Sequence, residues 1–356
     1  MNRRQFTGLA LGAAARLGQA QDSGRKIGFA MVGLGRISMQ HLAPSLKTSS
    51  KARVTALVSG HREKAEKMAA EYGIPAKNIY SYDNYDDIAG NRDIDAVYIA
   101  LPNSMHAEYT IRAAKAGKHV LSEKPMATSV ADAEAMVAAC KQANRKLMVA
   151  YRCQLEPTNL RAIELIRSGK LGRIQAIESA NGFNIRAGEW RLNMKLAGGG
   201  PLMDVGVYSL NACRYLTGEE PGEIKADWSV IDQDGRFNEV EENLAWSMKF
   251  PSGVVASCNT TYGANMPGFY RVHGTKGMLH AEPAFGYDGL RLTARIQGEA
   301  PIDEPNRAKD PAQFTREADY FADCITQDRE PKMSGEEGLR DMKLMAAIYR
   351  SCGRRG

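Results

Sequence analysis

The fold of this chain is decided by one stretch, residues 27–38, which reads IGFAMVGLGRIS. Its first six residues form a continuous apolar run, which is typical of a strand buried in a parallel sheet. Gly33 and Gly35 then supply a tight turn and let backbone amides approach a pyrophosphate, which the next helix N-terminus stabilises. Ser38 occupies the third small position, where Gly or Ala is usual. Between a strand and a helix, this motif predicts a dinucleotide-binding site.

Strand-like and helix-like runs alternate from this motif as far as residue 150. Strands are expected at residues 53–58, 96–101, 119–121 and 147–150, with helices between them. Alternation of this kind predicts a doubly wound parallel sheet, the Rossmann arrangement. We therefore assign residues 27–150 to a nucleotide-binding domain.

The pattern changes after residue 150. Consecutive strand-like runs, at residues 224–231, 242–250, 254–262, 269–273 and 278–281, are separated by short turns. Such runs predict a large, mostly antiparallel sheet, so residues 151–353 are expected to form an α+β domain. Residues 297–312 contain three prolines and are predicted to be a surface loop.

The first twenty residues differ in composition from the rest. Arg3 and Arg4 precede a short apolar run, Gly18 and Ala20 offer small residues for cleavage, and the segment has no Asp, Glu or Lys. This order is typical of a twin-arginine export signal and predicts a periplasmic protein, with residues 21–26 as a linker. A frayed basic N-terminus is the alternative interpretation.

The formal net charge of +6 falls to +3 when Arg3, Arg4 and Arg16 are removed. No basic stripe or nucleic-acid motif accompanies this charge, so nucleic acid is not an expected partner. Since no run of about 18 apolar residues exists, neither a membrane span nor stable membrane association is expected. The six cysteines are scattered without a C-x-x-C pair, and no metal site is predicted.

The end of the second strand indicates which dinucleotide is bound. An acidic residue there would bind the ribose of NAD, but the chain has Ser59 followed by Gly-His-Arg-Glu-Lys up to Lys64. A hydroxyl with several basic groups suits a 2′-phosphate, which favours NADP. The alternative is an ordinary helix start with solvated charges.

Three residues could perform acid–base chemistry on a hydroxyl group. Lys124 follows the strand at 119–121, at the sheet edge where ligands bind. Asp204 and Tyr208 are four residues apart and share one face of a helix. An acid, a phenol and an ammonium together can move a proton, whereas each alone is more often ordinary surface.

These motifs resemble the Gfo/Idh/MocA oxidoreductases, over about residues 26–350. The resemblance is carried by residues 33–38, 101–106, 123–125 and 204–208. Most members have His at the position of Tyr208. The tyrosine version, with residues 151–153, 190–192, 196–200 and 215–221, is similar to the branch of glucose–fructose and aldose–aldose oxidoreductases.

The resemblance implies a set of cofactor-binding residues. They are Gly33, Gly35, Arg36 and Ile37 at the pyrophosphate, Ser59 and Lys64 at the 2′-phosphate, Tyr82, Leu101, Pro102, Asn103 and His106 along the cofactor, Glu123 and Lys124 near the nicotinamide ribose, and Arg152, Trp190, Arg191 and Tyr287 covering it from the second domain.

The resemblance also implies a reaction on sugars. Tyr208 would take the proton from the C1 hydroxyl of an aldose, helped by the Lys124 ammonium within hydrogen-bond range, while Asp204 positions the sugar. The product is an aldonolactone, and a second sugar accepts the hydride from bound NADP to become an alditol. Family members pair through the second sheet, so a homo-oligomer, dimer or tetramer, is expected. The alternatives are a dehydrogenase with dissociable NAD(P), an exported NAD-dependent glycosidase, and a non-catalytic sugar sensor.

Overall fold

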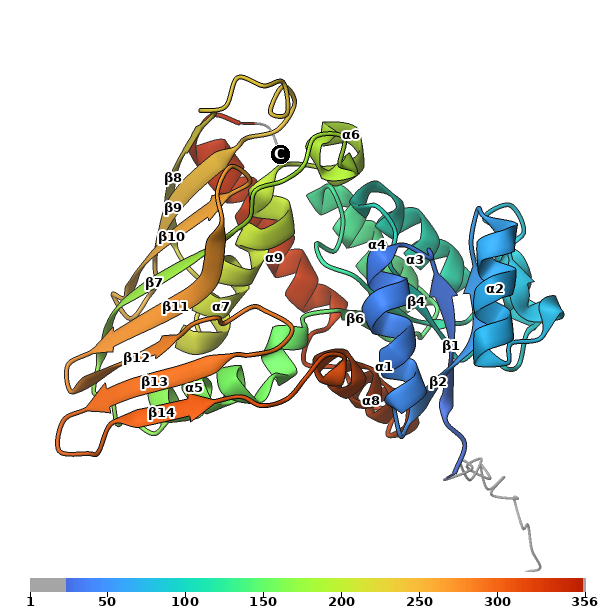
Figure 1. Cartoon of the computed structure of the whole chain (residues 1–356), viewed down its shortest axis with the longest axis horizontal. Coiled ribbons are helices and arrows are strands. Elements are labelled where there is room, and N and C mark those ends of the chain that lie inside the picture. Colours follow the sequence, from blue (N-terminus) through green and yellow to red (C-terminus); the bar gives the residue numbers. More distant parts are fainter. Residues whose placement is uncertain (1–23, 355–356) are drawn as a thin grey trace, which may run out of the picture.

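The computed structural model describes residues 24–354; the predicted export signal and the first half of the predicted linker lie outside this range. Two sheets organise the chain (Figure 1). The first has six parallel strands in the order β3-β2-β1-β4-β5-β6, which confirms the predicted Rossmann arrangement. Its strands are β1 (Ile27–Val32), β2 (Ala52–Val58), β3 (Ile79–Tyr80), β4 (Ala96–Ile99), β5 (His119–Ser122) and β6 (Leu147–Val149).

The strand order reverses between β1 and β4, and this switch point sets the place of the site. The glycine motif leaves the carboxyl end of β1, and residues 101–106 follow the end of β4. In open α/β sheets ligands bind in the crevice at such a reversal. The helices of this domain are a π-helical turn (Ser38–Leu42), α1 (Ala43–Thr48), α2 (Arg62–Tyr72), α3 (His106–Lys115) and α4 (Val130–Gln142).

The second sheet has eight strands in the order β14-β13-β12-β11-β7-β10-β9-β8. Only β7 and β10 pair in parallel, which confirms the predicted mostly antiparallel sheet. Its strands are β7 (Ile174–Gly182), β8 (Glu223–Ser229), β9 (Asn243–Lys249), β10 (Val255–Thr261), β11 (Met266–Gly274), β12 (Gly277–Ala281), β13 (Arg291–Ile296) and β14 (Ile302–Pro305).

The prediction that residues 297–312 form only a surface loop is wrong. Residues 302–305 form β14, which pairs with β13 at the edge of the sheet. The prolines misled the prediction, since Pro301 precedes the strand and Pro305 ends it, positions that an edge strand tolerates. Asp303 on β14 forms an ion pair with Arg291 on β13.

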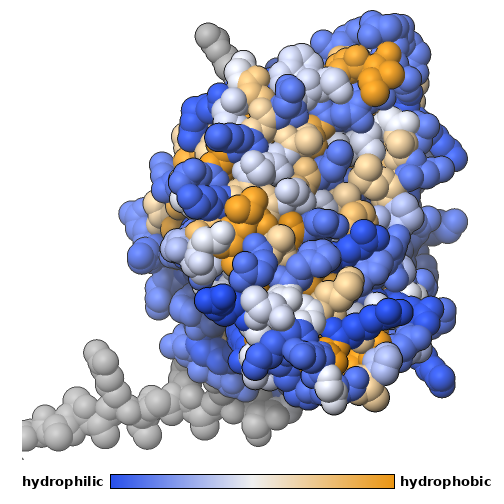
Figure 2. Space-filling view, turned by 90° about the vertical axis from the view of Figure 1, so that its left-hand side faces the viewer, coloured by the Kyte–Doolittle hydropathy of each residue, from blue (hydrophilic) through white to orange (hydrophobic). Residues whose placement is uncertain are grey.

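Helices cover one face of the second sheet and leave the other open (Figure 1). The covering helices are α5 (Pro157–Arg167), α7 (Val207–Thr217) and α9 (Gly335–Ser351). Burial accordingly alternates along β10, from exposed Val255 and buried Ala256 to exposed Asn259 and buried Thr260. Figure 2 shows the open face, where apolar side chains lie in separate patches among hydrophilic ones. None of the helices within residues 24–354 is both long and apolar enough to cross a bilayer.

The C-terminal helices join the two domains. Helix α8 (Ala312–Thr326) returns to the first sheet, where Phe321 packs against Phe29 with ring centroids 6.3 Å apart. Asp319 on the same helix accepts hydrogen bonds from the Ser49 hydroxyl and the Lys51 amide. Residues of α8 are therefore brought close to the crevice at the switch point.

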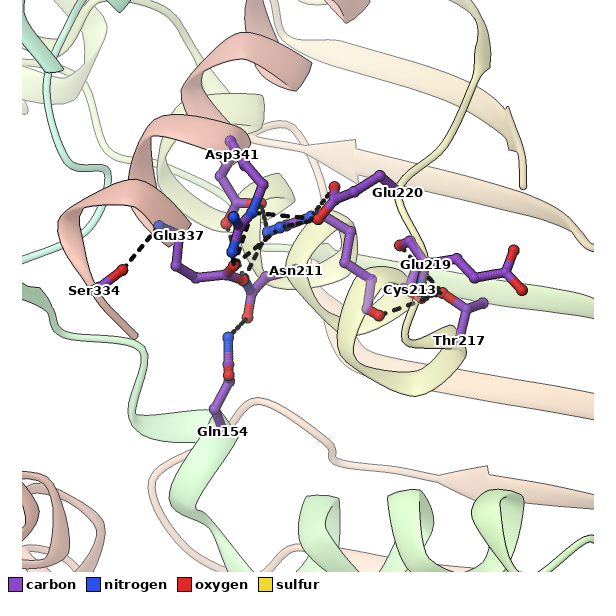
Figure 3. Close-up of polar contacts among 11 residues, drawn as sticks. Gln154, Asn211, Cys213, Thr217, Glu219, Glu220, Ser334, Glu337 and Asp341 are labelled. Carbon is purple, nitrogen blue, oxygen red and sulfur yellow. Dashed lines mark hydrogen bonds and ion pairs between the residues drawn. The ribbon is translucent and has the colours of Figure 1, made fainter. Parts of the chain in front are cut away.

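A buried ion network ties α7 to α9 (Figure 3). The side chains of Arg214 and Asp341 are 4% and 0% exposed. Arg214 donates to Asp341 at 2.5 Å and to Glu337 at 2.8 Å. It also forms a bidentate pair with Glu220, at 2.6 and 2.7 Å. Because three carboxylates surround this guanidinium, its removal would leave buried negative charge without a partner.

The network continues toward the boundary between the domains (Figure 3). Asn211, on the same helix, donates to Asp341 at 2.8 Å and accepts from the Gln154 side chain at 3.0 Å. Gln154 lies in the short helical turn that begins at Arg152, and α7 begins next to Tyr208. The network thus holds the turn that carries Arg152 against the helix that carries Tyr208.

Candidate active site

The glycine loop leaves space for a ligand. Gly33 has a φ of +88°, and a Cβ there would lie 2.7 Å from the Ala100 carbonyl oxygen, so this turn requires glycine. A Cβ on Gly35 would meet no atom within 4 Å, which leaves the space before the loop open. Ser38 is buried and its hydroxyl donates to the Gly33 carbonyl at 2.6 Å, fixing the turn to the helix that follows.

A segment of the second domain reaches this loop. The Arg36 side chain is 77% exposed and lies 3.5 Å from Glu189, while Ile37 packs against the core. The next residue, Trp190, is partly exposed, and the Arg191 guanidinium stacks over its ring at 4.6 Å. The predicted covering residues 190–191 therefore stand beside the predicted pyrophosphate loop.

The end of β2 gathers the groups expected at a 2′-phosphate. Ser59 is 6% exposed and its hydroxyl accepts a hydrogen bond from the His61 amide at 3.0 Å. Lys64 is exposed in the first turn of α2, and no carboxylate of the described residues lies within 4.0 Å of its ammonium. Tyr82 packs against Gly60, where a Cβ would lie 3.1 Å from the tyrosine ring.

The loop after β4 contacts both the glycine turn and the second domain. Leu101 contacts Gly33, and Pro102 beside it is partly exposed. The Asn103 side chain donates to the Ala197 carbonyl at 2.8 Å, so its amide group joins the two domains.

The structure gives His106 a different role from the predicted one, which was to line the cofactor. It is 1% exposed, and its two ring nitrogens lie 2.9 Å from the carbonyl oxygens of Leu101 and Pro125. Burial lowers the pKa of this imidazole, and the hydrogen bonds to these carbonyl oxygens oppose the change. His106 therefore connects the loops after β4 and β5 from inside the domain.

Asp204 is the centre of the charged cluster. The Lys124 ammonium donates to the Asp204 backbone carbonyl at 2.6 Å and to one oxygen of its carboxylate at 3.2 Å. Arg191 donates to the other carboxylate oxygen at 2.9 Å, and the Tyr262 hydroxyl donates to the same oxygen at 3.0 Å. Burial alone would raise the pKa of Asp204, but Arg191 and Lys124 outweigh it and lower the pKa to about 2. Asp204 is therefore a fixed carboxylate that can orient hydroxyl groups.

The Tyr208 hydroxyl has a cationic partner other than the predicted one. The sequence led us to expect Lys124 within hydrogen-bond range, but Lys124 binds Asp204 and lies over the Tyr208 ring, 4.8 Å from its centroid. Arg152 instead donates to the Tyr208 hydroxyl at 3.3 Å. Burial raises the pKa of Tyr208, and the Arg152 guanidinium opposes this rise.

Arg152 is itself held rigidly. It is 3% exposed and donates to the Phe285 carbonyl at 2.6 Å and the Gln313 side chain at 2.5 Å. Its guanidinium lies 4.6 Å from the centroid of the Tyr287 ring, the predicted covering residue from the second domain. Burial raises the pKa of Tyr287 to about 12.

Sequence reasoning missed Tyr262, Phe285 and Gln313, which hold the cluster from the second domain and α8. The Phe285 ring stacks on Tyr208 with centroids 5.7 Å apart. No local motif marks these residues, although Tyr262 ends a predicted strand. The assembled site offers a phenol against a guanidinium, an oriented carboxylate and an open crevice, the elements needed to move a proton at a bound hydroxyl.

Comparisons with known proteins agree with this geometry. Residues 27–151 match the model of an oxidoreductase family with an NAD-binding Rossmann fold, and residues 159–280 match the GFO/IDH/MocA C-terminal domain. The crystal structure of aldose–aldose oxidoreductase from Caulobacter crescentus, complexed with glycerol, is 45% identical with a TM-score of 0.89, covering 92% of this chain and 98% of that one.

Two curated relatives are sugar dehydrogenases. The D-xylose 1-dehydrogenase [NADP(+)] of Haloarcula marismortui is 32% identical over 90% of this chain and 89% of its own length. The D-xylose 1-dehydrogenase (NADP(+)) 2 of Haloferax volcanii is 31% identical over 91% and 96%. With both domains matched and this level of identity, the chain belongs to the Gfo/Idh/MocA family of oxidoreductases.

Proposed function

We propose that this protein is an NADP-dependent sugar oxidoreductase that oxidises an aldose at C1 to an aldonolactone and passes the hydride to a second sugar, giving an alditol. The observation that carries the proposal is the Tyr208 hydroxyl held by Arg152 next to the fixed carboxylate of Asp204. The names of the similar proteins, an aldose–aldose oxidoreductase and two NADP-dependent xylose dehydrogenases, support the same class of substrate.

The side chains divide the work on the sugar between them. NADP, when bound, supplies the nicotinamide that takes up and returns hydride. The Arg152 guanidinium stabilises Tyr208 as a phenolate, which accepts the proton of the C1 hydroxyl and becomes a neutral phenol as hydride leaves C1. Asp204, kept ionised by Lys124 and Arg191, accepts hydrogen bonds from sugar hydroxyls. In the second half-reaction Tyr208 returns its proton to the carbonyl oxygen of the acceptor sugar.

The residues present fit NADP. The open space at Gly35 accommodates a pyrophosphate against backbone amides, and Ser59 with Lys64 offers a hydroxyl and an unpaired cation to the 2′-phosphate. Tyr82, Leu101, Pro102, Glu123, Trp190 and Tyr287 remain the proposed lining of the cofactor.

Replacing Lys64 with Ala should weaken NADP binding and leave NAD binding unchanged. Loss of one hydrogen bond to a charged group corresponds to roughly a tenfold rise in Kd. Because Lys64 is exposed, the fold should be unaffected. Titration calorimetry with each dinucleotide measures both values.

Lys67→Ala is the matched control, because Lys67 is exposed on the same helix one turn further on. It should bind NADP like the parent protein. An equal loss of NADP and NAD affinity in Lys64→Ala would contradict the assignment of Lys64 to the 2′-phosphate.

Sugar added to the purified protein tests the proposed function. If NADP stays bound between half-reactions, an aldose should produce the absorbance of reduced nicotinamide with no cofactor supplied, and a second sugar should remove it. Absorbance that appears only after NADP is supplied would identify an ordinary dehydrogenase with dissociable cofactor.

We also propose that copies of the chain associate through the open face of the second sheet, which the helices leave uncovered (Figure 2). Val255 on β10 is an exposed apolar side chain of this face. Light scattering should give a dimer or tetramer, and a monomer at all concentrations would contradict this. The twin-arginine pair supports export to the periplasm, which cell fractionation tests.

A further inference from the structure

A buried chain of polar groups lies behind the site. The Tyr98 hydroxyl on β4 lies 2.8 Å from the Glu317 carboxyl on α8 and 3.2 Å from the Glu123 carboxyl after β5. Tyr98 and Glu317 are both 0% exposed, whereas Glu123 is partly exposed. The proton transfer described above uses neither Tyr98 nor Glu317.

If both carboxyl groups are ionised, one proton is missing for the two hydrogen bonds that join Tyr98 to Glu317 and Glu123. A tyrosine hydroxyl has a single proton, so Tyr98 can donate to Glu317 or to Glu123 but not to both. The other contact then needs a proton from a carboxyl group. Within residues 24–354, no Lys, Arg or His nitrogen lies within 4.0 Å of either carboxyl to compensate a second negative charge. Two carboxylates this close together, with Glu317 fully buried and no cation beside either, would be strongly unfavourable within the described residues.

Glu317 is the better place for the additional proton. Its second oxygen, Oε1, is buried and has no hydrogen-bond partner among the described residues, which costs less for a neutral carboxyl than for a carboxylate. Glu123 is less buried, and its second oxygen accepts from the Lys124 amide at 3.3 Å. The charge therefore belongs on Glu123.

We propose that Glu317 carries a proton at neutral pH and donates it in a hydrogen bond to Tyr98, which in turn donates to Glu123. Glu317 is then a positioning residue that keeps Glu123 oriented and singly charged at the crevice. This role rests on the proposed function, in which Glu123 contacts the nicotinamide ribose of NADP.

Electrostatics agree with this arrangement. Burial first, and then the negative charge of Glu123, raise the pKa of Glu317 to about 8, while Tyr98 and Arg152 oppose the rise. The Cys153 thiol is the other titratable group facing it. Because the folded state then binds one more proton than the unfolded state between about pH 4.5 and 8, this group makes stability fall as pH rises through that window.

Infrared spectroscopy of the holoenzyme tests the protonation directly, without any sugar. The wild-type protein should show the C=O stretch of a buried protonated carboxyl at neutral pH, and Glu317→Gln should lack it. Glu317→Gln should also lose the fall in Tm between pH 5 and 8. Glu164→Gln, a change at an exposed carboxyl on α5, is the matched control and should resemble the parent in both. Absence of the band in the parent, or its persistence in Glu317→Gln, would overturn the proposal.

The positioning role has a separate readout. Glu317→Gln retains a neutral donor and should bind NADP like the parent, while Glu317→Leu should raise the Kd about tenfold, the effect of disturbing one hydrogen bond to a charged group. Parent-like NADP affinity in a folded Glu317→Leu would overturn this role. A protein that fails to oxidise sugars yet shows the carboxyl band and this affinity pattern would refute only the proposed function.

Discussion

Replacing Tyr208 with Phe should lower kcat by roughly 10²–10⁴-fold, the usual contribution of a positioned acid–base group. The change removes only the hydroxyl that Arg152 contacts at 3.3 Å. The ring should keep its stacking on Phe285 and its contact with the Lys124 ammonium, so folding and NADP binding should be unaffected. Steady-state kinetics with an aldose, together with NADP titration, measures the two effects separately.

Tyr215→Phe is the matched control, because it removes the hydroxyl of another buried tyrosine on α7, which donates to Asn159. Its kcat should remain within a few-fold of the parent value. Near-normal kcat in Tyr208→Phe would exclude Tyr208 as the proton acceptor. Comparable losses in both variants would instead indicate that the packing of α7, and not the Tyr208 hydroxyl, limits the reaction.

Replacing Arg214 with Leu should destabilise the protein by about 3–5 kcal/mol, the cost of leaving a buried carboxylate without its cation. Asp341 is 0% exposed and would retain its hydrogen bond from Asn211 but lose its cation. Since the network also reaches Gln154, we expect a lower Tm and a lower kcat, because the turn that carries Arg152 loses its support. Urea unfolding and kinetics measure the two effects.

Arg340→Leu provides the comparison, because Arg340 pairs with Glu337 in the same network but is 50% exposed. An exposed pair is worth about 0–1 kcal/mol, so this variant should remain close to the parent. The double variant Arg214→Leu/Asp341→Asn should recover part of the lost stability, since it removes the unpaired charge. Equal effects of Arg214→Leu and Arg340→Leu would show that burial of the pair does not govern stability.

The parallel domain could be predicted because its signals are local. Each strand is a short apolar run, and the glycine motif indicates a turn with a positive φ, which Gly33 has. Strand β14 escaped prediction because its pairing with β13 is a tertiary contact that proline-rich residues 301–305 conceal. The return of α8 to the first sheet was equally invisible, since it depends on the packing of Phe321 against a strand almost 300 residues earlier.

The sequence predicted which residues form the candidate site better than it predicted which of them contact each other. Lys124, Asp204 and Tyr208 lie together, but spacing along a helix could not reveal that Lys124 contacts Asp204 more closely than the Tyr208 hydroxyl. Arg152 was expected only to cover the cofactor, and its hydrogen bond to Tyr208 depends on how the two domains meet. His106 likewise is buried by loops that the sequence does not place against each other.

The measurement that tests the central claim most directly is the stoichiometry of products formed from an aldose by the purified protein with no cofactor added. Chromatography or NMR should find aldonolactone and alditol in equal amounts, accumulating over many turnovers per enzyme molecule. Tyr208→Phe should form neither. Lactone that accumulates only with an equivalent of added NADP, and without alditol, would contradict the transfer between two sugars.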